Sequence, residues 1–567
     1  MTGTSSTGHT PPQCGAIPDG SPDDGERSLR RSEPLLGAVL LGLSAVMLFW
    51  HLGDQPLWQD EAEVAQLGRS ILRCGVPKVW DGTNIVTVQD GRDFNKAYVW
   101  TYSPWLQDYL AAGALGLFGR STAAARLPFA LAGWAAIGLV WLLCRRLACG
   151  AGVGLLAVAL LTCSVPFLLY MRQCRYYPLL ALCAVAATIL YLTPRGRLGV
   201  WLGLGAVVGA MFHANCLGAA GLLLGLWGHA LANCRRDHGR ISGLCVATAV
   251  TALIALPWGL YVRVWETPAR VPVAAPTHIV GVLRYLSLLG LLAFPILVAP
   301  LTAARLREAG ADGARRAAGA IVWVTIGTVV VPCLLPVEAR LGYAAGLFPL
   351  LAVLTAFGLD YIARRRWGVA APLAVMVAFT NVVHIVPFVL LCPLIAKVPL
   401  SSARLARLVA LVRRAAQPRF LADEYLFEMT HHYSGPTGVI CRYLREQARP
   451  TDEVLANYDQ ECIAFYTDLK VVRPERWLFP NTKTQVQPFD ARPDWIIPRR
   501  ARRFSDELRG AAETAGYAAI VLPAVDIPWG NKPDPTYHKF RTVVEGEPVV
   551  IYRARRPGQP SSRLPKS

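Results

Sequence analysis

Charged residues are scarce in this chain. Asp, Glu, Lys and Arg make up 17% of its 567 residues, whereas about a quarter is usual in soluble globular proteins. Hydrophobic residues make up 53%, and many runs are apolar over about 18 residues or more, enough to cross a membrane as a helix. The composition excludes an ordinary soluble protein and predicts a polytopic α-helical membrane protein.

The sequence also lacks the spacings that metal and redox sites need. None of its 14 cysteines forms a CxxC pair, and no Cys/His cluster has the spacing of a zinc site. Most cysteines lie in apolar runs, where they act as small hydrophobic residues. Only Cys441 and Cys462 are candidates for a disulfide. His431 and His432 are adjacent but have no evident partner ligands, so a divalent metal is not supported.

Aromatic-interleaved basic patches are absent, so the net charge of +19 does not indicate nucleic-acid binding. The arginines instead cluster in short loops between apolar runs, as the positive-inside rule predicts for cytoplasmic loops. These loops orient the chain in the membrane, with the start of the first span inside.

The apolar runs and the loop arginines together predict about 11 spans. The predicted spans are residues 35–52, 126–143, 151–170, 177–193, 199–213, 215–232, 241–262, 283–303, 318–335, 341–362 and 369–391. Residues 104–118 are also apolar, but counting them as a crossing would place Arg145 and Arg146 outside. We therefore interpret 104–118 as an interfacial or re-entrant helix.

The predicted organisation has four parts. They are a disordered cytoplasmic tail (1–33), a transmembrane domain (34–398) with a first external loop at 53–125, an extracytoplasmic α/β domain (399–556) and a disordered tail (557–567). The α/β assignment rests on helix patterns in "GVICRYLREQA" and "SDELRGAAETAG", strand patterns in "DEVLANY", "DWIIP" and "YAAIVLP", and a hairpin pattern in "RTVVEGEPVVIYR". Residues 400–421 read as a basic amphipathic stretch on the outer surface.

An acidic pair, Asp60 and Glu61, follows the first span within "WQDEAEVAQLGRSIL". Apolar residues in this stretch recur at helical spacing, and Gly75 and Pro77 follow as helix terminators. Asp60 stands at the start with Glu63 three residues later, the pattern of a capping box. One interpretation is a helix cap alone; the other is a fixed carboxylate that accepts a proton from an attacking hydroxyl or amine.

Four motifs resemble GT-C glycosyltransferases of the protein O-mannosyltransferase and lipid A aminoarabinose transferase group. They are "LWQDEAEVAQLGRSIL", "SPWLQDYLAAGALGLFG" followed by "AAARLPFALAG", "RQCRYYPLLALCAV" and "EARLGYAAGLFPLLA". They occur in the order of the family between residues 35 and 365, and on one membrane face of the predicted topology.

The resemblance implies transfer of a sugar from a polyprenyl phosphate, with inversion, at the outer membrane surface. It implies Asp60 as the general base or acceptor-orienting group and Glu61 as its support. The departing lipid phosphate needs positive charge, for which Arg340, Arg172 and Arg175 are the candidates. Snorkelling of these arginines to the lipid headgroups is the alternative.

The same resemblance suggests the lining of the substrate cavity: Tyr102, Tyr176, Tyr177, His213 and Glu266. For His213, an ordinary role in a tight turn is the alternative.

Two departures from the family pattern stand out. Where family members carry Lys-Pro-Pro or His-Pro-Pro, this chain has "YSPW", so a phosphate-binding cation is missing and Lys96 is the candidate substitute. Tyr177 stands where a second acidic residue is common.

We therefore predict an inverting glycosyltransferase of the bacterial cytoplasmic (inner) membrane. Its partners would be membrane lipids, a polyprenyl-phosphate-linked sugar and a glycan, lipid or protein acceptor, without nucleic acid and without an assigned cofactor. Two alternatives stay open. A lipid or glycan transporter is disfavoured because the sequence shows no paired repeats and no charges inside spans. A catalytically inactive membrane scaffold stays open because the cation and the second acid are missing.

Overall fold

The computed structural model describes most of the chain. The described residues are 22–88, 91–146, 149–193, 197–236, 238–266, 274–308, 312–335, 339–396, 403–433, 435–474, 492–500 and 502–555. The predicted tail at 557–567 and most of the tail at 1–33 lie outside them. The first helix starts at Pro22, so its first turns fall within that predicted tail.

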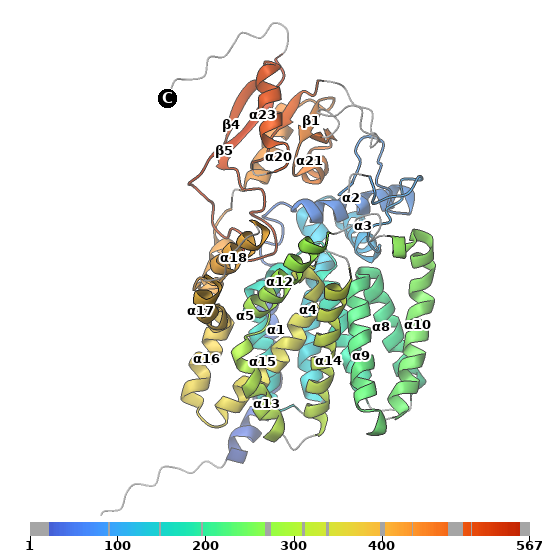
Figure 1. The fold of residues 1–567 in the computed structure, drawn as a ribbon, viewed down its shortest axis with the longest axis vertical. Coiled ribbons are helices and arrows are strands. Elements are labelled where there is room, and N and C mark those ends of the chain that lie inside the picture. The colour runs from blue at the N-terminus through green and yellow to red at the C-terminus, as the bar shows by residue number, and fades with distance from the viewer. Residues whose placement is uncertain are drawn as a thin grey trace, which may run out of the picture.

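A bundle of apolar helices forms the body of the molecule, and a unit containing a β-sheet lies at one end of it (Figure 1). The bundle helices are α1 (Pro22–Phe49), α4 (Thr122–Arg146), α5 (Ala151–Cys163), α6 (Val165–Met171), α7 (Tyr177–Leu192), α8 (Leu198–Ala214), α9 (Cys216–Ala232), α10 (His238–Val262), α12 (Ala275–Leu292), α13 (Ala299–Glu308), α14 (Asp312–Leu334), α15 (Leu347–Ala363), α16 (Trp367–Phe379) and α17 (Val382–Ala396). The bundle agrees with the predicted α-helical membrane protein.

The helices differ in their capacity to cross a membrane. Within the described residues, five helices are each long and apolar enough to cross a membrane: α1, α4, α10, α12 and α14. Two bent pairs in the same part of the chain meet the same criteria when each pair is counted as one span: α5–α6, bent by 70°, and α16–α17, bent by 83°. Helices α7, α8, α9 and α15 are apolar but shorter. The predicted spans at 151–170 and 369–391 thus each correspond to a bent pair of helices.

The predicted bounds of the span at 283–303 are wrong, because no single helix covers them. Helix α12 ends at Leu292 and α13 begins only at Ala299, with a short 3₁₀ turn at Ile296–Val298 between them. Pro295 precedes that turn, and proline both lacks an N–H donor and disfavours helical geometry in the residue before it. The apolar run continues through this break, so hydropathy alone could not reveal it.

The first loop carries two helices, α2 (Gln59–Cys74) and α3 (Leu106–Phe118), at the end of the bundle nearest the sheet (Figure 1). The predicted amphipathic helix is confirmed as α2, which ends at Gly75 in a left-handed conformation with φ of 74°. Gly68 allows close packing, since a Cβ there would stand 3.0 Å from the backbone nitrogen of Ala112 in α3. With 13 residues, α3 is too short to cross a membrane.

The predicted capping box at Asp60 and Glu63 is wrong. The N-cap residue of α2 is Trp58, in extended geometry with φ of −81° and ψ of 168°. Its backbone N–H donates to Glu61 Oε2 at 3.2 Å, so Glu61 makes the backward contact of this cap. Asp60 lies in the first turn without a capping role.

The C-terminal part contains a five-stranded mixed sheet in the order β2-β1-β3-β5-β4. Its strands are β1 (Glu453–Ala456), β2 (Lys470–Val472), β3 (Trp495–Ile497), β4 (Ala518–Val525) and β5 (Pro548–Arg553). Strand β1 runs parallel to β2 and β3, whereas β5 runs antiparallel to β3 and β4. The helices of this part are α18 (Ala403–Ala415), α19 (Leu421–Thr430), α20 (Pro436–Gln447), α21 (Gln460–Thr467) and α23 (Ser505–Thr514).

The predicted hairpin in "RTVVEGEPVVIYR" is wrong. Only its second half forms a strand, β5, and both edges of β5 are occupied by β3 and β4. The turn at Gly546, with φ of 140°, leads into β5 from a segment without strand structure.

The two candidate disulfide cysteines, Cys441 and Cys462, are both free. The Cys462 thiol donates to the Leu57 carbonyl at 3.2 Å.

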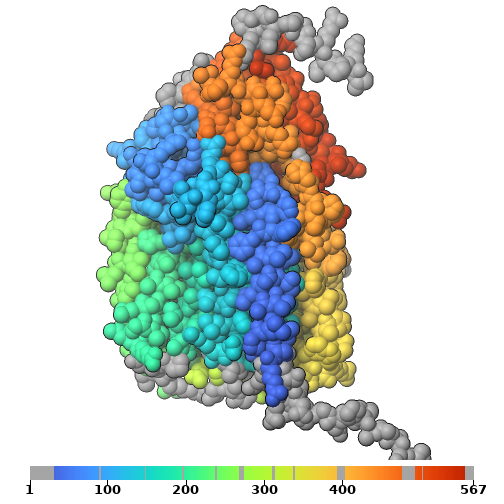
Figure 2. Space-filling model, turned by 180° about the vertical axis from the view of Figure 1, so that it is seen from behind, coloured from blue at the N-terminus to red at the C-terminus, as the bar shows by residue number. Residues whose placement is uncertain are grey.

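The sheet unit docks onto the first loop through α21. Tyr466 in α21 accepts a hydrogen bond from the Leu57 backbone N–H at 2.8 Å and shares one with the Thr122 hydroxyl at 2.6 Å. Asp468 accepts from Arg69 at 2.9 Å and from Arg120. Seen from behind, the first loop and the C-terminal unit together cover this end of the bundle (Figure 2).

The opposite end carries arginine clusters that the sequence assigns to the cytoplasm. Arg305 on α13 and Arg364 beyond α15 both donate to Asp360, at 2.7 and 2.9 Å. Figure 1 shows α13 at the bottom of the bundle, away from α2 and the strands. The basic loops and the acidic pair thus lie at opposite ends.

Candidate active site

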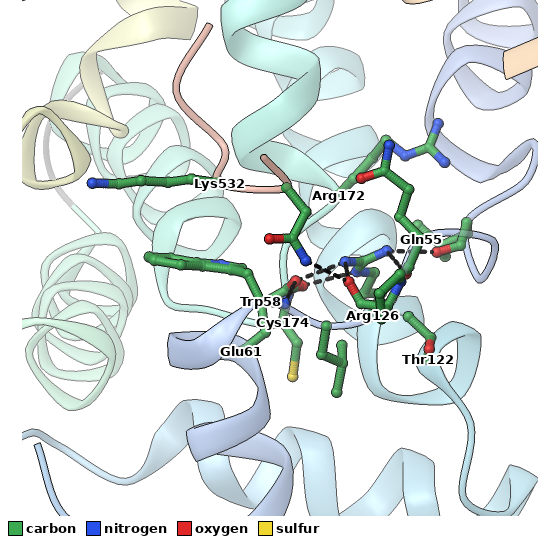
Figure 3. A network of polar contacts seen from close by, with 12 residues as sticks. Gln55, Trp58, Glu61, Thr122, Arg126, Arg172, Cys174 and Lys532 are labelled. Atoms are coloured by element: carbon green, nitrogen blue, oxygen red, sulfur yellow. Dashed lines mark hydrogen bonds and ion pairs between the residues drawn. The ribbon is translucent and has the colours of Figure 1, made fainter. Parts of the chain in front are cut away.

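Glu61 is held in a buried ion pair with Arg126 of α4. Arg126 Nε donates to Glu61 Oε1 at 2.8 Å and Nη2 donates to Oε2 at 2.7 Å, and the side chains are 5% and 0% exposed. The Cys174 backbone N–H donates to Glu61 Oε1 at 2.8 Å. Figure 3 shows these contacts converging on Glu61. The pair joins the start of α2 to α4 and to the loop after α6.

Arg126 also organises the chain before α2. Its Nη1 donates to the carbonyls of Leu52 and Gln55 at 3.1 and 3.0 Å, and its Nη2 lies 3.3 Å from the Pro56 carbonyl. Both carboxylate oxygens of Glu61 thus accept hydrogen bonds. These contacts fix the start of α2 and with it the position of Asp60. Arg126 belongs to the Arg-Leu-Pro motif, but the sequence alone did not indicate a role for this arginine.

Asp60 differs from Glu61 in its exposure. Its side chain is 23% exposed, and Oδ2 lies 3.4 Å from Nη2 of Arg175. Nη1 of Arg175 donates to the Asp60 carbonyl and to Glu63 Oε1, both at 3.0 Å. Arg175 is thus shared by two carboxyl groups on one face of α2, and Asp60 keeps acceptor capacity toward solvent.

Two buried acids lie behind this pair. Burial raises the pKa of Glu63 to about 8, against the opposing charge of Arg175. Burial also raises the pKa of Asp108 in α3 well above its usual range, with Glu63 adding to the effect. Within the described residues, neither carboxyl oxygen of Asp108 has a hydrogen-bond partner. Asp108 was missed in the sequence analysis, although an aspartate within "LQDYLAAGALGLF" was a usable signal.

The stability of the protein is expected to fall as pH rises from about 4.5 to about 8. The native state holds the Glu63 proton up to a pKa of about 8, whereas the unfolded state releases it near 4.5, so unfolding releases a proton in this window. One such group contributes a slope of at most about 1.4 kcal/mol per pH unit. Thermal unfolding across this range should show a shallower slope in Glu63→Gln than in wild type.

The exposed Glu446 on α20 provides the control for this series. Glu446→Gln should leave the slope unchanged, and Asp108 should keep part of the slope in Glu63→Gln because its shift has the same sign. A Glu63→Gln protein with the full wild-type slope would contradict the assignment.

A cluster of aromatic rings lies next to Arg175. The Arg175 guanidinium lies 5.8 Å from the Tyr176 ring centroid, and Tyr176 stacks on Tyr343 with centroids 6.5 Å apart. Tyr177 meets Tyr176 edge to face at 4.6 Å. A Cβ at Gly342 would stand 2.5 Å from the Tyr177 ring, so glycine is needed where this turn packs on the tyrosine.

Arg340 precedes the 3₁₀ turn at Leu341–Ala344 and is exposed. It interacts electrostatically with Tyr102, Tyr176 and Tyr177. Burial raises the pKa of Tyr102, and the charge of Arg340 opposes that rise. The structure thus gathers the predicted site residues Asp60, Arg175, Arg340 and the three tyrosines around one region.

The remaining predicted site residues lie elsewhere. Arg172 donates to carbonyls at the end of α1, including those of Trp50 and His51 at 2.9 Å each, which satisfies acceptors that a helix end leaves open. Lys96 is exposed. His213 Nε2 lies 3.0 Å from the Ile254 carbonyl, and Glu266 pairs with Arg263 at 3.4 Å. These contacts of Arg172, His213 and Glu266 are thus with residues other than Asp60 and Arg175.

A metal centre finds no support in the described residues. No group of three or more His, Cys, Asp or Glu side chains has the geometry to hold an ion there. His431 stacks on Phe427 with ring centroids 3.8 Å apart and bonds locally.

Comparisons with known proteins agree with this architecture. Residues 103–261 match the sequence model of the family described as dolichyl-phosphate-mannose-protein mannosyltransferase. ArnT from Cupriavidus metallidurans bound to undecaprenyl phosphate is similar in structure, with a TM-score of 0.55, 15% identity and coverage of 93% of this chain and 99% of that chain. Its apo state gives a TM-score of 0.55, 16% identity and coverage of 93% and 98%.

An Archaeoglobus fulgidus oligosaccharyltransferase in the apo form is less similar in structure. Its TM-score is 0.45, with 13% identity and coverage of 78% of this chain and 64% of that chain. No curated protein matches the sequence. The ArnT likeness spans nearly the whole chain and confirms the GT-C glycosyltransferase fold that the sequence motifs indicated.

Proposed function

We propose that this protein is an inverting glycosyltransferase that uses a polyprenyl-phosphate sugar as donor. The observation that carries the proposal is the pair of Asp60 and Arg175 at the end of an ArnT-like bundle, with Asp60 partly exposed and its helix fixed by the Glu61–Arg126 pair. The similar ArnT structure is described as bound to undecaprenyl phosphate. The same class of lipid carrier is proposed here.

In the proposed reaction, the acceptor oxygen attacks the anomeric carbon from the face opposite the lipid phosphate. A new C–O bond forms, the bond to the phosphate oxygen breaks, and the configuration inverts in this single displacement. Asp60 takes the proton of the attacking hydroxyl. The phosphate leaves with the bonding electron pair, and Arg340 and Arg175 stabilise its growing charge. Glu61 and Arg126 act as positioning residues.

The direct test supplies purified protein with radiolabelled polyprenyl-phosphate sugars and with lipid, glycan and peptide acceptors. Transfer of label, or slow hydrolysis that releases polyprenyl phosphate, is the expected result. Binding without any turnover would favour the inactive scaffold. Movement of intact donor across a vesicle membrane would favour the transporter.

The proposed site faces the outside of the bacterial cytoplasmic membrane, together with the C-terminal unit. Cys74, exposed at the end of α2, provides a natural reporter for this orientation. A membrane-impermeant thiol reagent should label wild-type protein in spheroplasts, and Cys74→Ser should lose most of that label. Labelling of Cys74 only in inverted vesicles would place the site in the cytoplasm and contradict the proposal.

A further inference from the structure

A loop of the C-terminal unit reaches over the start of α2. Asn531 Nδ2 donates to the Pro56 carbonyl at 3.0 Å. The next residue, Lys532, extends over the Trp58 ring, with Nζ 5.9 Å from its centroid (Figure 3). Trp58 is the N-cap residue of α2, two positions before Asp60. The loop thus brings a cation from the C-terminal unit to the candidate active site.

Lys532 has aromatic neighbours in place of an anionic partner. Its Nζ lies 5.1 Å from the Tyr537 ring centroid, and among the described residues it makes no hydrogen bond or ion pair. Asp534 lies in the same loop, but its Oδ1 accepts from the Thr536 N–H at 2.9 Å and from the Thr536 hydroxyl at 2.6 Å. The Lys532 ammonium therefore has donors available for a ligand.

A second cation lies at the same ring. The Arg284 guanidinium of α12 lies 5.6 Å from the Tyr537 centroid, and its Nη2 is 3.4 Å from the Tyr537 hydroxyl. Burial lowers the pKa of Lys532, and the charges of Arg284 and Arg340 lower it further, while Asp534 and Asp60 oppose them. Lys532 and Arg284 are like charges at one ring, and a bound anion would offset their mutual repulsion, as Asp534 and Asp60 do in part.

We propose that Lys532 binds the phosphate of the lipid donor, with Arg284 beside it. This inference rests on the proposed glycosyltransferase function. It assigns to the C-terminal unit the phosphate-binding cation that the "YSPW" segment lacks, in place of the exposed Lys96. An ammonium carries three rotatable donors as a compact charge, which suits a phosphate approaching from the membrane. The C-terminal unit would then complete the active site.

The test measures binding of radiolabelled undecaprenyl monophosphate to the full chain in detergent, with undecaprenol as the uncharged comparison. Lys532→Met should weaken monophosphate binding about 10- to 100-fold, as expected for loss of a hydrogen bond to a charged group. Binding of undecaprenol should not change. Lys532→Arg, which keeps the charge, should recover much of the loss. Lys539→Met, at an exposed lysine of the same loop, should bind as wild type.

Each outcome separates this inference from the proposed function. Equal monophosphate binding by wild type and Lys532→Met, with sugar transfer by both, would overturn the role of Lys532 and leave the glycosyltransferase proposal intact. Equal losses for monophosphate and undecaprenol would indicate a structural role and also overturn it. Wild-type protein that neither binds the monophosphate nor transfers sugar would overturn both proposals.

Discussion

Asp60→Asn is expected to reduce sugar transfer by about 10²- to 10⁴-fold, the range in which general-base catalysis contributes. Asparagine keeps the shape of the side chain but cannot take a proton from the acceptor. Because Arg175 also donates to Glu63 and to the Asp60 carbonyl, its position should persist in the variant. The loss should therefore appear in kcat, with little change in donor binding or thermal stability.

Asp54→Asn is the matched control for this experiment. Asp54 lies in the same loop, six residues before Asp60, but its side chain is 51% exposed and it pairs locally with His51. Its variant should transfer sugar at the wild-type rate. If Asp60→Asn transferred label as fast as Asp54→Asn, Asp60 could not be the base, whatever the reaction.

Arg126→Met is expected to destabilise the fold by about 3–5 kcal/mol, the usual cost of breaking a buried ion pair from one side. The variant leaves the fully buried Glu61 carboxylate without its counter-charge. It also removes the donors to the carbonyls of Leu52 and Gln55. Thermal unfolding in detergent, together with the yield of folded protein, measures the effect.

A double variant and a surface control sharpen this prediction. Glu61→Gln combined with Arg126→Met removes the buried charge and should recover part of the stability lost in the single variant. Arg120→Met breaks the pair with Asp468, in which the two side chains are 34% and 57% exposed, and should cost only about 0–1 kcal/mol. Equal unfolding temperatures for the Arg126 and Arg120 variants would show that the buried pair has no special role.

Local patterns predicted the elements whose stability depends on nearby residues. Helix α2 was identified from apolar spacing and from Gly75, which adopts the left-handed conformation that ends it. Strand β1 and helix α20 were likewise predicted, because alternation and helical periodicity reflect one buried face. The same reasoning failed in "RTVVEGEPVVIYR", since alternation cannot specify which strands become partners, and β5 pairs with β3 and β4.

The candidate site was only partly predictable. The acidic pair could be located because it interrupts an apolar region beside a span, but its two members could not be assigned different environments. That difference arises when α4 brings Arg126 to Glu61 and the loop after α6 brings Arg175 to Asp60. Lys532 could not be placed at all, because some 470 residues separate it from Trp58, which it contacts.

The sequence by itself determined the membrane class, the helical bundle, the motifs of the GT-C group and the position of the acidic pair, because these follow from composition and from contacts between near neighbours. The tertiary structure alone decided which carboxylate is buried and which stays partly exposed, where the apolar runs bend, and which cations approach Trp58. These properties depend on burial and on charge–charge distances between distant segments, and such quantities exist only once the chain has folded.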